Sequence, residues 1–198
     1  MAFNDEQAAI PEGIRTADFL IRPLLAADAR LDYAAVMESR DFLRSWDQSG
    51  WPEDGFSLAD NRADLERAEQ RHNAREAFTF TVMNPEQNEC LGCIYIFPRN
   101  ARWLAEAAVQ PGAEMRWEEI DAVAMFWIRQ SRLAEQLDRR LLMVLRDWFA
   151  REWQFGTYCL LTNEQLLQQA QMFEDMALRC RLSLRLPEHP GCYRAYTW

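Results

Sequence analysis

The chain has 198 residues, of which 49% are hydrophobic and 27% are charged, a composition typical of one globular domain and not of a disordered segment. Its 22 lysines and arginines stand against 31 aspartates and glutamates, which gives a formal net charge of -9. This balance disfavours partners that need a cationic face on the protein, namely nucleic acids and anionic membranes.

Features of membrane and secreted proteins are also missing from the sequence. No run approaches the ~20 apolar residues that are needed to cross a bilayer. Residues 1–13 contain no lysine or arginine, whereas a signal peptide begins with positive charge. The five cysteines are odd in number and form no disulfide framework. We therefore expect a cytoplasmic protein.

The first third of the chain predicts a leader, one strand and two helices. Residues 1–18 are expected to form a loose leader, followed by a single domain over residues 19–198. Phe19–Pro23 has the pattern of an edge strand, because its proline cannot donate to a ladder. Helical spacing of apolar residues predicts helices over Asp28–Arg44 and Ser57–Arg75.

The middle of the chain predicts a hairpin and a long connection. Phe78–Val82 alternates apolar and hydroxyl residues, as a half-buried strand does, and Leu91–Phe97 follows after turn residues. Pro98–Asp121 is irregular and contains Trp103 and Trp117. Because long loops inside compact domains are often functional, we expect this segment to be mobile and to cover the mouth of a substrate site.

The last third alternates strands and helices. Ala122–Ile128 is continuously apolar, which predicts a central strand that is covered on both faces. An amphipathic helix is expected over Leu137–Trp153, a strand over Phe155–Thr162 and a helix over Asn163–Leu178. Two more strands are expected, over Arg181–Leu186 and Cys192–Trp198. The order predicts a mixed α/β (α+β) domain.

The sequence gives little support for a metal site or for a serine hydrolase. Cys90 and Cys93 have the spacing of metal ligands, but no second pair exists, and residues three apart on a regular strand point to opposite faces. We therefore expect ordinary strand cysteines and no metal. The two histidines, His72 and His189, lie near no nucleophile elbow, which disfavours a serine hydrolase.

Five segments taken in order resemble the GNAT-type N-acetyltransferases. They are Phe19–Leu24, Phe78–Met83, Leu91–Ile96, Phe126–Arg129 and Leu137–Leu142. The set is similar in particular to a bacterial branch in which a WVRxSR segment follows the central strand. The resemblance implies a mixed, mostly antiparallel central sheet with two splayed parallel strands and helices on both faces.

The resemblance also implies acetyl-CoA as co-substrate. In the family its pantetheine arm lies between the splayed strands, here Ala122–Ile128 and Phe155–Thr162, and its pyrophosphate rests on backbone N–H groups at the start of the following helix. The residues of this chain that the resemblance places near the cofactor are Phe126, Trp127, Ile128, Arg129, Ser131, Arg132 and Asn163.

The pyrophosphate loop departs from the family pattern. Gln136 and Asp138 stand where the family has glycines, and Leu133 stands where it has arginine or glutamine. As an N-cap, Asp138 would occupy the N–H groups that a phosphate needs and would repel its charge. The nearby polar and basic residues either replace the loop or form a solvated basic patch; they are Arg129, Ser131, Arg132, Arg139 and Arg140.

Candidate groups for proton transfer lie near the central strand. Asp121 opens it and Glu119 precedes it, so either carboxylate can accept a proton from an ammonium substrate, unless both are solubility charges of the loop. Tyr158 is the third candidate, although a position within a strand also suits a core residue. Phe173 stands where many relatives have the tyrosine that protonates the leaving thiolate.

The sequence leaves two functions open. The first is an acyl-CoA-dependent N-acetyltransferase that acts on a primary amine of a small molecule or of a protein terminus. The second is a non-catalytic GNAT-fold protein that serves as a binding or dimerisation module, and a homodimer is compatible with both. The degenerate pyrophosphate loop separates them, because only the enzyme has to bind acetyl-CoA. A fold unrelated to GNAT is a third, weaker alternative.

Overall fold

The computed structural model describes residues 3, 9–110, 115–153, 155–187 and 189–198. Over this part of the chain, nine strands form one sheet in the order β1-β2-β3-β4-β6-β7-β9-β8-β5. All neighbours are antiparallel except β6 and β7, which run parallel. The strands are β1 (Ile14–Arg15), β2 (Leu20–Pro23), β3 (Phe78–Met83), β4 (Cys90–Pro98), β5 (Ala108–Gln110), β6 (Ala122–Ile128), β7 (Tyr158–Asn163), β8 (Arg179–Arg185) and β9 (Cys192–Thr197).

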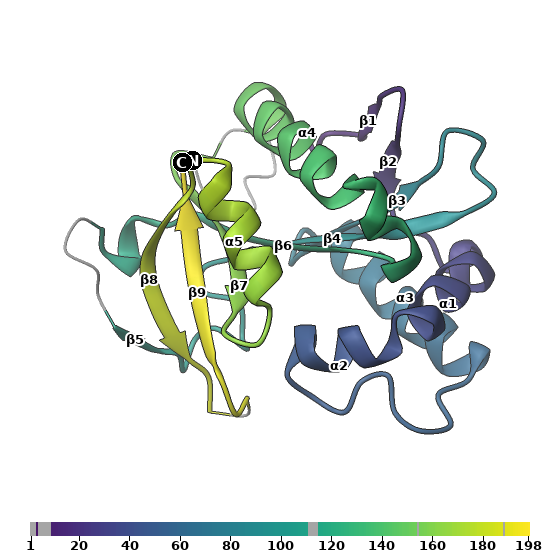
Figure 1. The fold of residues 1–198 in the computed structure, drawn as a ribbon, viewed down its shortest axis with the longest axis horizontal. Helices are drawn as coiled ribbons and strands as arrows, with labels where there is room; N and C mark the ends of the chain where they lie inside the picture. Colours follow the sequence, from purple (N-terminus) through teal and green to yellow (C-terminus); the bar gives the residue numbers. More distant parts are fainter. Residues whose placement is uncertain (1–2, 4–8, 111–114, 154, 188) are drawn as a thin grey trace.

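Helices cover both faces of this sheet. They are α1 (Ala29–Glu38), α2 (Arg40–Asp47), α3 (Leu58–Asn73), α4 (Leu137–Glu152) and α5 (Leu167–Asp175), with short 3-10 turns η1 (Ala26–Asp28), η2 (Trp117–Glu119) and η3 (Gln130–Glu135). Figure 1 shows α4 on one side of the strands β2, β3, β4 and β6, and α1 to α3 on the other. None of the described helices is long and apolar enough to span a bilayer. The predicted fold class is confirmed.

The strand β6 is the centre of the molecule, as predicted. It lies between β4 and β7, and all seven of its residues are buried. Side chains alternate along a strand, so Phe126 and Ile128 enter the core beneath α4, while Met125 and Trp127 enter the core beneath α1 to α3. The continuous apolar run of the sequence follows from this double coverage.

The predicted helix over Asp28–Arg44 is broken at Ser39. Ser39 is fully buried and has φ -100° and ψ 14°, and it separates α1 from α2. Its hydroxyl accepts the N–H of Gln130 at 3.1 Å. The break therefore joins α1 and α2 to the segment that follows β6, a contact with no local signal in the sequence.

The strand β3 differs from the half-buried strand that its alternation predicts. All six of its residues are buried, including Thr79 and Thr81. The second face of the sheet is covered by α3, whose His72 places Nδ1 at 3.2 Å from the carbonyl oxygen of Thr79. The hydroxyl residues therefore face a helix layer and not solvent.

The expected leader of residues 1–18 contributes to the fold. Within it, β1 pairs with β2, and Ile10 and Ile14 pack against the core beneath α4. The ring of Phe3 lies 5.0 Å from that of Phe78. The described residues of the expected leader therefore pack on the domain, the boundary at residue 19 stays a prediction, and residues 1–2 and 4–8 lie outside the described residues.

A β-bulge at the start of β4 places two cysteines on one face of the sheet. Val82 pairs with Gly92 and Met83 pairs with Cys90, so Leu91 is an extra residue. Only glycine fits at position 92, because a Cβ there would lie 2.0 Å from the carbonyl oxygen of Trp127. The extra residue reverses the alternation, and Cys90 and Cys93 both face the core beneath α1 to α3. The prediction that they point to opposite faces is wrong.

Candidate active site

The parallel strands β6 and β7 separate along their length. Their pairing covers Ala122–Ala124 of β6 and Tyr158–Leu160 of β7. The remaining residues of each strand, 125–128 and 161–163, diverge and leave a gap in the sheet. Side chains from both helix layers reach the backbone of β6 at this gap.

The carbonyl oxygen of Phe126 marks the gap. It accepts the indole N–H of Trp46, from α2, at 3.1 Å and the side-chain amide of Gln169, from α5, at 3.2 Å. A carbonyl oxygen has two lone pairs, so any further donor to this oxygen has to displace one of these side chains.

Asn163 anchors α2 at the same gap. It ends β7, and its Nδ2 donates to the carbonyl oxygens of Ser45 and Trp46, both at 2.9 Å. Its Oδ1 accepts the N–H of Gln165 at 2.9 Å. These bonds fix the end of α2 against the sheet and thereby position the ring of Trp46.

A cavity of about 430 Å³ lies between the sheet and the layer formed by α1 to α3. Its aromatic lining includes Trp46, Trp51 and Trp103, and its charged lining includes Asp32, Asp47, Asp64 and Arg71. Trp46 borders both the cavity and the gap, so the two spaces adjoin. Trp103 belongs to the connection between β4 and β6 that was expected to cover a substrate site; the mobility of that segment stays a prediction.

His189 lines this cavity and has a defined tautomer. Its Nδ1 lies 3.0 Å from the carbonyl oxygen of Asp47 and 3.2 Å from the hydroxyl of Tyr193. A carbonyl only accepts, so Nδ1 carries the proton and Nε2 is the acceptor nitrogen. Burial raises the pKa of Tyr193 well above its ordinary value, which keeps the phenol neutral. Sequence reasoning assigned His189 no function, because its partners lie more than a hundred residues away or in the following strand.

Asp121 is engaged in holding β6 and β7 together. Its Oδ2 accepts the N–H of Gly156 at 2.7 Å and of Thr157 at 3.1 Å. These contacts lie at the paired end of the two strands, which is the end opposite to the gap. A role for Asp121 as proton acceptor stays a prediction, and the geometry gives it a structural one.

The other two predicted catalytic residues also lie at the paired end. Glu119 in η2 forms an ion pair with Arg116 at 3.0 Å, and this contact lowers the pKa of its carboxyl. Tyr158 packs its ring 4.9 Å from that of Phe149, and burial raises its pKa to about 12. Both roles stay predictions, and neither residue lines the described cavity.

The arginines after β6 are paired with carboxylates. Glu89, directly before β4, binds Arg129 at 3.0 Å and Arg132 at 2.5 Å. Arg132 also contacts Glu135 at 2.8 Å, and Arg129 contacts Glu38. These two predicted cofactor ligands are therefore held in a network of acids, and they form neither a solvated patch nor an unengaged anion site.

Ser131 and the arginines of α4 have similar contacts. The backbone N–H of Ser131 donates to Glu38 at 3.1 Å. Arg139 pairs with Asp175 at 3.4 Å, and Arg140 contacts Asp18. A phosphate would have to compete with a carboxylate at each of these groups.

The first turn of α4 is only partly as predicted. Gln136, with φ 56°, is the N-cap, and not Asp138. Asp138 nevertheless accepts the N–H of Arg139 at 2.8 Å, which occupies one of the N–H groups at this helix end. A groove between α4 and α5 is lined by Asp138 and Asp175 against the single cation Arg139. With two carboxylates against one cation, this groove fits a pyrophosphate poorly.

Of the remaining predicted cofactor residues, Phe126 reaches the gap through its backbone, whereas the backbone carbonyl of Trp127 faces β4. The side chains of Phe126 and Ile128 are buried beneath α4, and Trp127 donates its indole N–H to Tyr95 at 3.3 Å on the other face. The N–H and C=O of one strand residue point to the same neighbouring strand. The N–H of Phe126 therefore faces the gap together with its carbonyl.

Comparison with solved structures identifies this architecture. Three similar structures are the ribosomal L7/L12 alpha-N-protein acetyltransferase RimL in complex with coenzyme A, the ribosomal-protein-S5-alanine acetyltransferase from Vibrio fischeri, and the microcin C7 self-immunity acetyltransferase MccE in complex with acetyl-CoA and AMP. In this order, their sequence identities to the chain are 14%, 12% and 10%, and their TM-scores are 0.67, 0.65 and 0.65. The matches cover 94%, 92% and 94% of this chain, and 95%, 93% and 96% of the three solved chains. The chain has the GNAT fold.

The GNAT fold expected from the ordered segments is shown by the similarity to solved structures. No protein-family model matches the sequence, and no curated protein matches it at a significant level. The similarity of residues 126–132 to the WVRxSR segment of one GNAT branch stays a prediction. In GNAT terms, β6 and β7 are the splayed pair, and the cavity lies on the face of the sheet that α1 to α3 cover.

Proposed function

We propose that this GNAT-fold protein is an acetyl-CoA-dependent N-acetyltransferase. One observation carries the proposal: Trp46 lines the cavity and also donates to the carbonyl oxygen of Phe126 in the gap. A ligand in the cavity and a thioester in the gap would be separated by one side chain. That arrangement brings an acceptor and an acyl donor together, as group transfer requires.

The acceptor that suits the cavity is a primary amine, on a small molecule or at a protein terminus. Three lining carboxylates, Asp32, Asp47 and Asp64, stand against one lining arginine, so the cavity favours a protonated amine. Indole rings add cation–π attraction. RimL and the Vibrio fischeri enzyme are named for ribosomal-protein substrates, and MccE for microcin C7 self-immunity. Both substrate sizes are compatible with a cavity of about 430 Å³.

His189 is the proton acceptor that the geometry supports best. An ammonium must lose a proton before its nitrogen forms a bond to the acetyl carbon, and the C–S bond then breaks and leaves a thiolate that takes up a proton. Nε2 of His189 is the acceptor nitrogen because Nδ1–H donates to Asp47. The N–H of Phe126 is placed to stabilise negative charge on the carbonyl oxygen of the acetyl group. Asp121, Glu119 and Tyr158 remain the alternatives from sequence.

The second candidate function is a non-catalytic binding or dimerisation module. The observation in its favour is the neutralised pyrophosphate loop, where Glu89 holds Arg129 and Arg132 and where Asp138 occupies the N–H of Arg139. In such a protein the cavity binds its ligand without acyl transfer.

A titration with acetyl-CoA separates the two candidates. We expect the melting temperature to rise by several degrees at ~100 times the dissociation constant, since that occupancy adds ~2.7 kcal/mol. Release of free thiol is then followed with a panel of polyamines, amino-acid amides and peptides with a free N-terminus. A flat melting titration up to millimolar acetyl-CoA would reject the enzyme and leave the binding module.

A further inference from the structure

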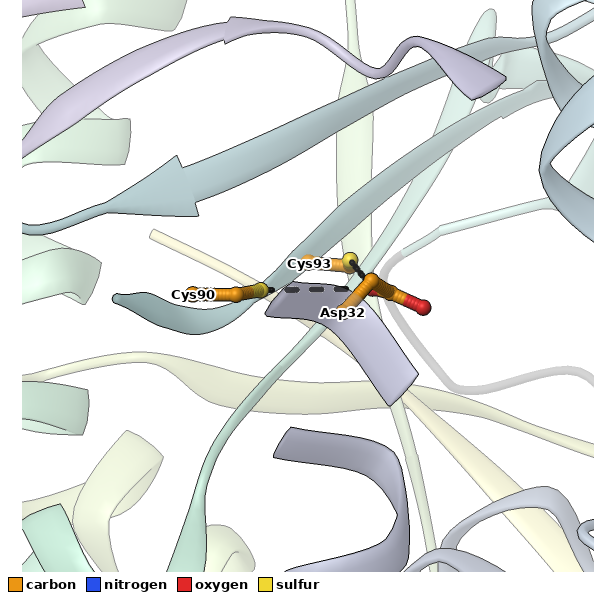
Figure 2. A group of neighbouring side chains, drawn as sticks. All are labelled: Asp32, Cys90 and Cys93. Atoms are coloured by element: carbon orange, nitrogen blue, oxygen red, sulfur yellow. Dashed lines mark hydrogen bonds between the residues drawn. The ribbon is translucent and has the colours of Figure 1, made fainter. Parts of the chain in front are cut away.

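Three buried side chains with metal-binding atoms converge beneath the β-bulge of β4. Asp32 lies on α1, and Cys90 and Cys93 lie on β4, on either side of the extra residue (Figure 2). The ligand atoms of the three residues all lie within 4.8 Å of one another. In Figure 2 both sulfur atoms point toward the carboxylate of Asp32.

The two sulfur–oxygen separations of the cluster are close to those in a tetrahedral metal site. Sγ of Cys93 lies 3.4 Å and Sγ of Cys90 lies 3.9 Å from Oδ1 of Asp32. With Zn–S at ~2.3 Å and Zn–O at ~2.0 Å, ligands at tetrahedral angles are ~3.5 Å apart for S and O and ~3.8 Å apart for two sulfurs. An ion can therefore enter the cluster with small side-chain movements.

The charge of the cluster also favours a cation. Asp32 is 3% exposed, and none of the ion pairs among the described residues includes it. Its described partners are the two thiols and Nδ2 of Asn61 at 3.0 Å. An isolated carboxylate is costly in such a buried place. With Zn²⁺ and two thiolates the cluster carries a net charge of minus one, the same as the carboxylate alone beside two neutral thiols.

We propose that Asp32, Cys90 and Cys93 form a binding site for a thiophilic divalent metal ion, with Zn²⁺ as the preferred ion. Thiolate and carboxylate ligands suit Zn²⁺ better than Mg²⁺ or Ca²⁺, which take oxygen ligands. Binding releases the two thiol protons, and a proton from Asp32 where it is protonated. The site is separate from the gap between β6 and β7 and does not depend on acetyl transfer.

The fourth ligand can come from the cavity. Asp32 and Cys93 line it, together with Asn61. Both donors of the Asn61 amide group are engaged, with Asp32 and with the carbonyl oxygen of Ala29, and its Oδ1 is buried without a partner among the described residues. A metal-bound water would supply a donor for such an oxygen. Three protein ligands with one open position are typical of catalytic zinc sites.

Cobalt substitution of the full-length, reduced protein tests the site. Co²⁺ takes the place of Zn²⁺ and makes the site visible through thiolate-to-cobalt charge-transfer bands and the intense d–d bands of tetrahedral coordination. We expect one equivalent to bind, Zn²⁺ to displace it, and Zn²⁺ to raise the melting temperature. Mutation of residues that only hydrogen-bond to metal ligands weakens metal binding by about 10–100-fold. Loss of a ligand itself should cost more, so we expect Cys93→Ser and Asp32→Asn each to weaken binding by at least ~100-fold.

Matched variants identify the ligands. Cys159→Ser alters another fully buried cysteine of the same core, and Cys180→Ser alters an exposed one. Both controls should retain the cobalt bands with unchanged intensity. Thermal melting without metal establishes that each variant is folded. If Cys93→Ser does not fold, Cys90→Ser provides a second ligand variant. Absence of charge-transfer bands in the wild type would overturn the proposal, as would bands that persist in Cys90→Ser and Asp32→Asn.

Discussion

The indole N–H of Trp46 donates a hydrogen bond of 3.1 Å to the carbonyl oxygen of Phe126, which lies 80 residues further along the chain. This bond connects α2 to the gap between β6 and β7 and places the same side chain in the wall of the cavity. A single residue therefore stands between the space proposed for the acceptor and the space proposed for the acyl donor.

Trp46→Phe should lower the free energy of unfolding by about 1–2 kcal/mol, because it removes a buried hydrogen bond and some packing against Tyr95. The loss stays modest because Gln169 still donates to Phe126. The measurement is urea unfolding. Trp51→Phe is the control, since its indole bonds Asp64 in a less buried place; an equal loss in both variants would contradict the special role of Trp46.

Gly92→Ala should destabilise the protein by at least ~3 kcal/mol, since its Cβ would overlap the carbonyl oxygen of Trp127 in the neighbouring strand. Gly50→Ala is the matched control, because a Cβ at that position meets nothing within 4 Å. Urea unfolding of both variants at neutral pH provides the comparison. A loss below ~1 kcal/mol at Gly92 would show that the bulge adapts easily.

Glu38 makes stability depend on pH. Its hydrogen bond with Arg129 holds the pKa of its carboxyl at about 2, below the ordinary value of 4.5. A lowered acid pKa contributes stability above the unfolded-state pKa, and that contribution is lost as the pH falls through the folded-state value. Because the side chain is 32% exposed, we expect Glu38→Gln to cost only about 1 kcal/mol at pH 7.

The difference between wild type and Glu38→Gln should shrink as the pH falls from about 5 toward 2. Paired urea titrations at neutral and acid pH measure it. Asp54→Asn serves as the control, since Asp54 is paired with Arg44 but is 89% exposed. A difference that grows on acidification would have the wrong sign for this mechanism.

Asp138→Ala should strengthen binding of acetyl-CoA, because it frees the N–H of Arg139 and removes a negative charge from the start of α4. The expected gain is about three- to tenfold, equivalent to ~0.7–1.4 kcal/mol. Asp147→Ala alters an exposed aspartate of the same helix and should leave affinity unchanged. Isothermal titration of all three proteins is the measurement, and equal affinities would remove Asp138 from the cofactor site.

His189→Gln should reduce kcat by about 10²–10³-fold with little change in KM, since general-base catalysis contributes about 10²–10⁴-fold. Asp121→Asn tests the alternative base and should change stability more than rate, because its carboxylate binds two backbone N–H groups. A large fall in kcat for Asp121→Asn, with none for His189→Gln, would assign the role of catalytic base to Asp121 and not to His189.

The sequence was sufficient wherever the pattern of one segment determines its environment. Seven apolar residues predicted β6 as the central strand, and the spacing of Leu141 and Leu145 predicted the buried face of α4. The sequence was insufficient where the conformation or the pairing of a residue depends on a partner far away in the chain. The bulge at Gly92 depends on the carbonyl of Trp127 across the ladder, and the state of Arg129 depends on Glu38 and Glu89.

The candidate site shows the same division. The gap between β6 and β7 followed from the ordered resemblance of several segments, because parallel strands joined by a helix are a property of chain order. The cavity did not, since residues such as Asp32, Trp103 and His189 meet only after folding. A sequence with two histidines gives no local signal that one of them has its Nδ1 bonded to the end of α2.

The hydrogen bond from Trp46 to the carbonyl oxygen of Phe126 also couples the binding of the two proposed ligands. An acyl donor that displaces Trp46 from this carbonyl frees the indole ring and so moves part of the cavity wall. The donor thereby changes the affinity of the cavity for the acceptor. Because linkage between two ligands is reciprocal, the acceptor changes the affinity for the donor by the same factor. Asn163 keeps the end of α2 in place, so the change is confined to the ring. Binding titrations of each ligand, with and without the other, would then show the same fold-change in affinity.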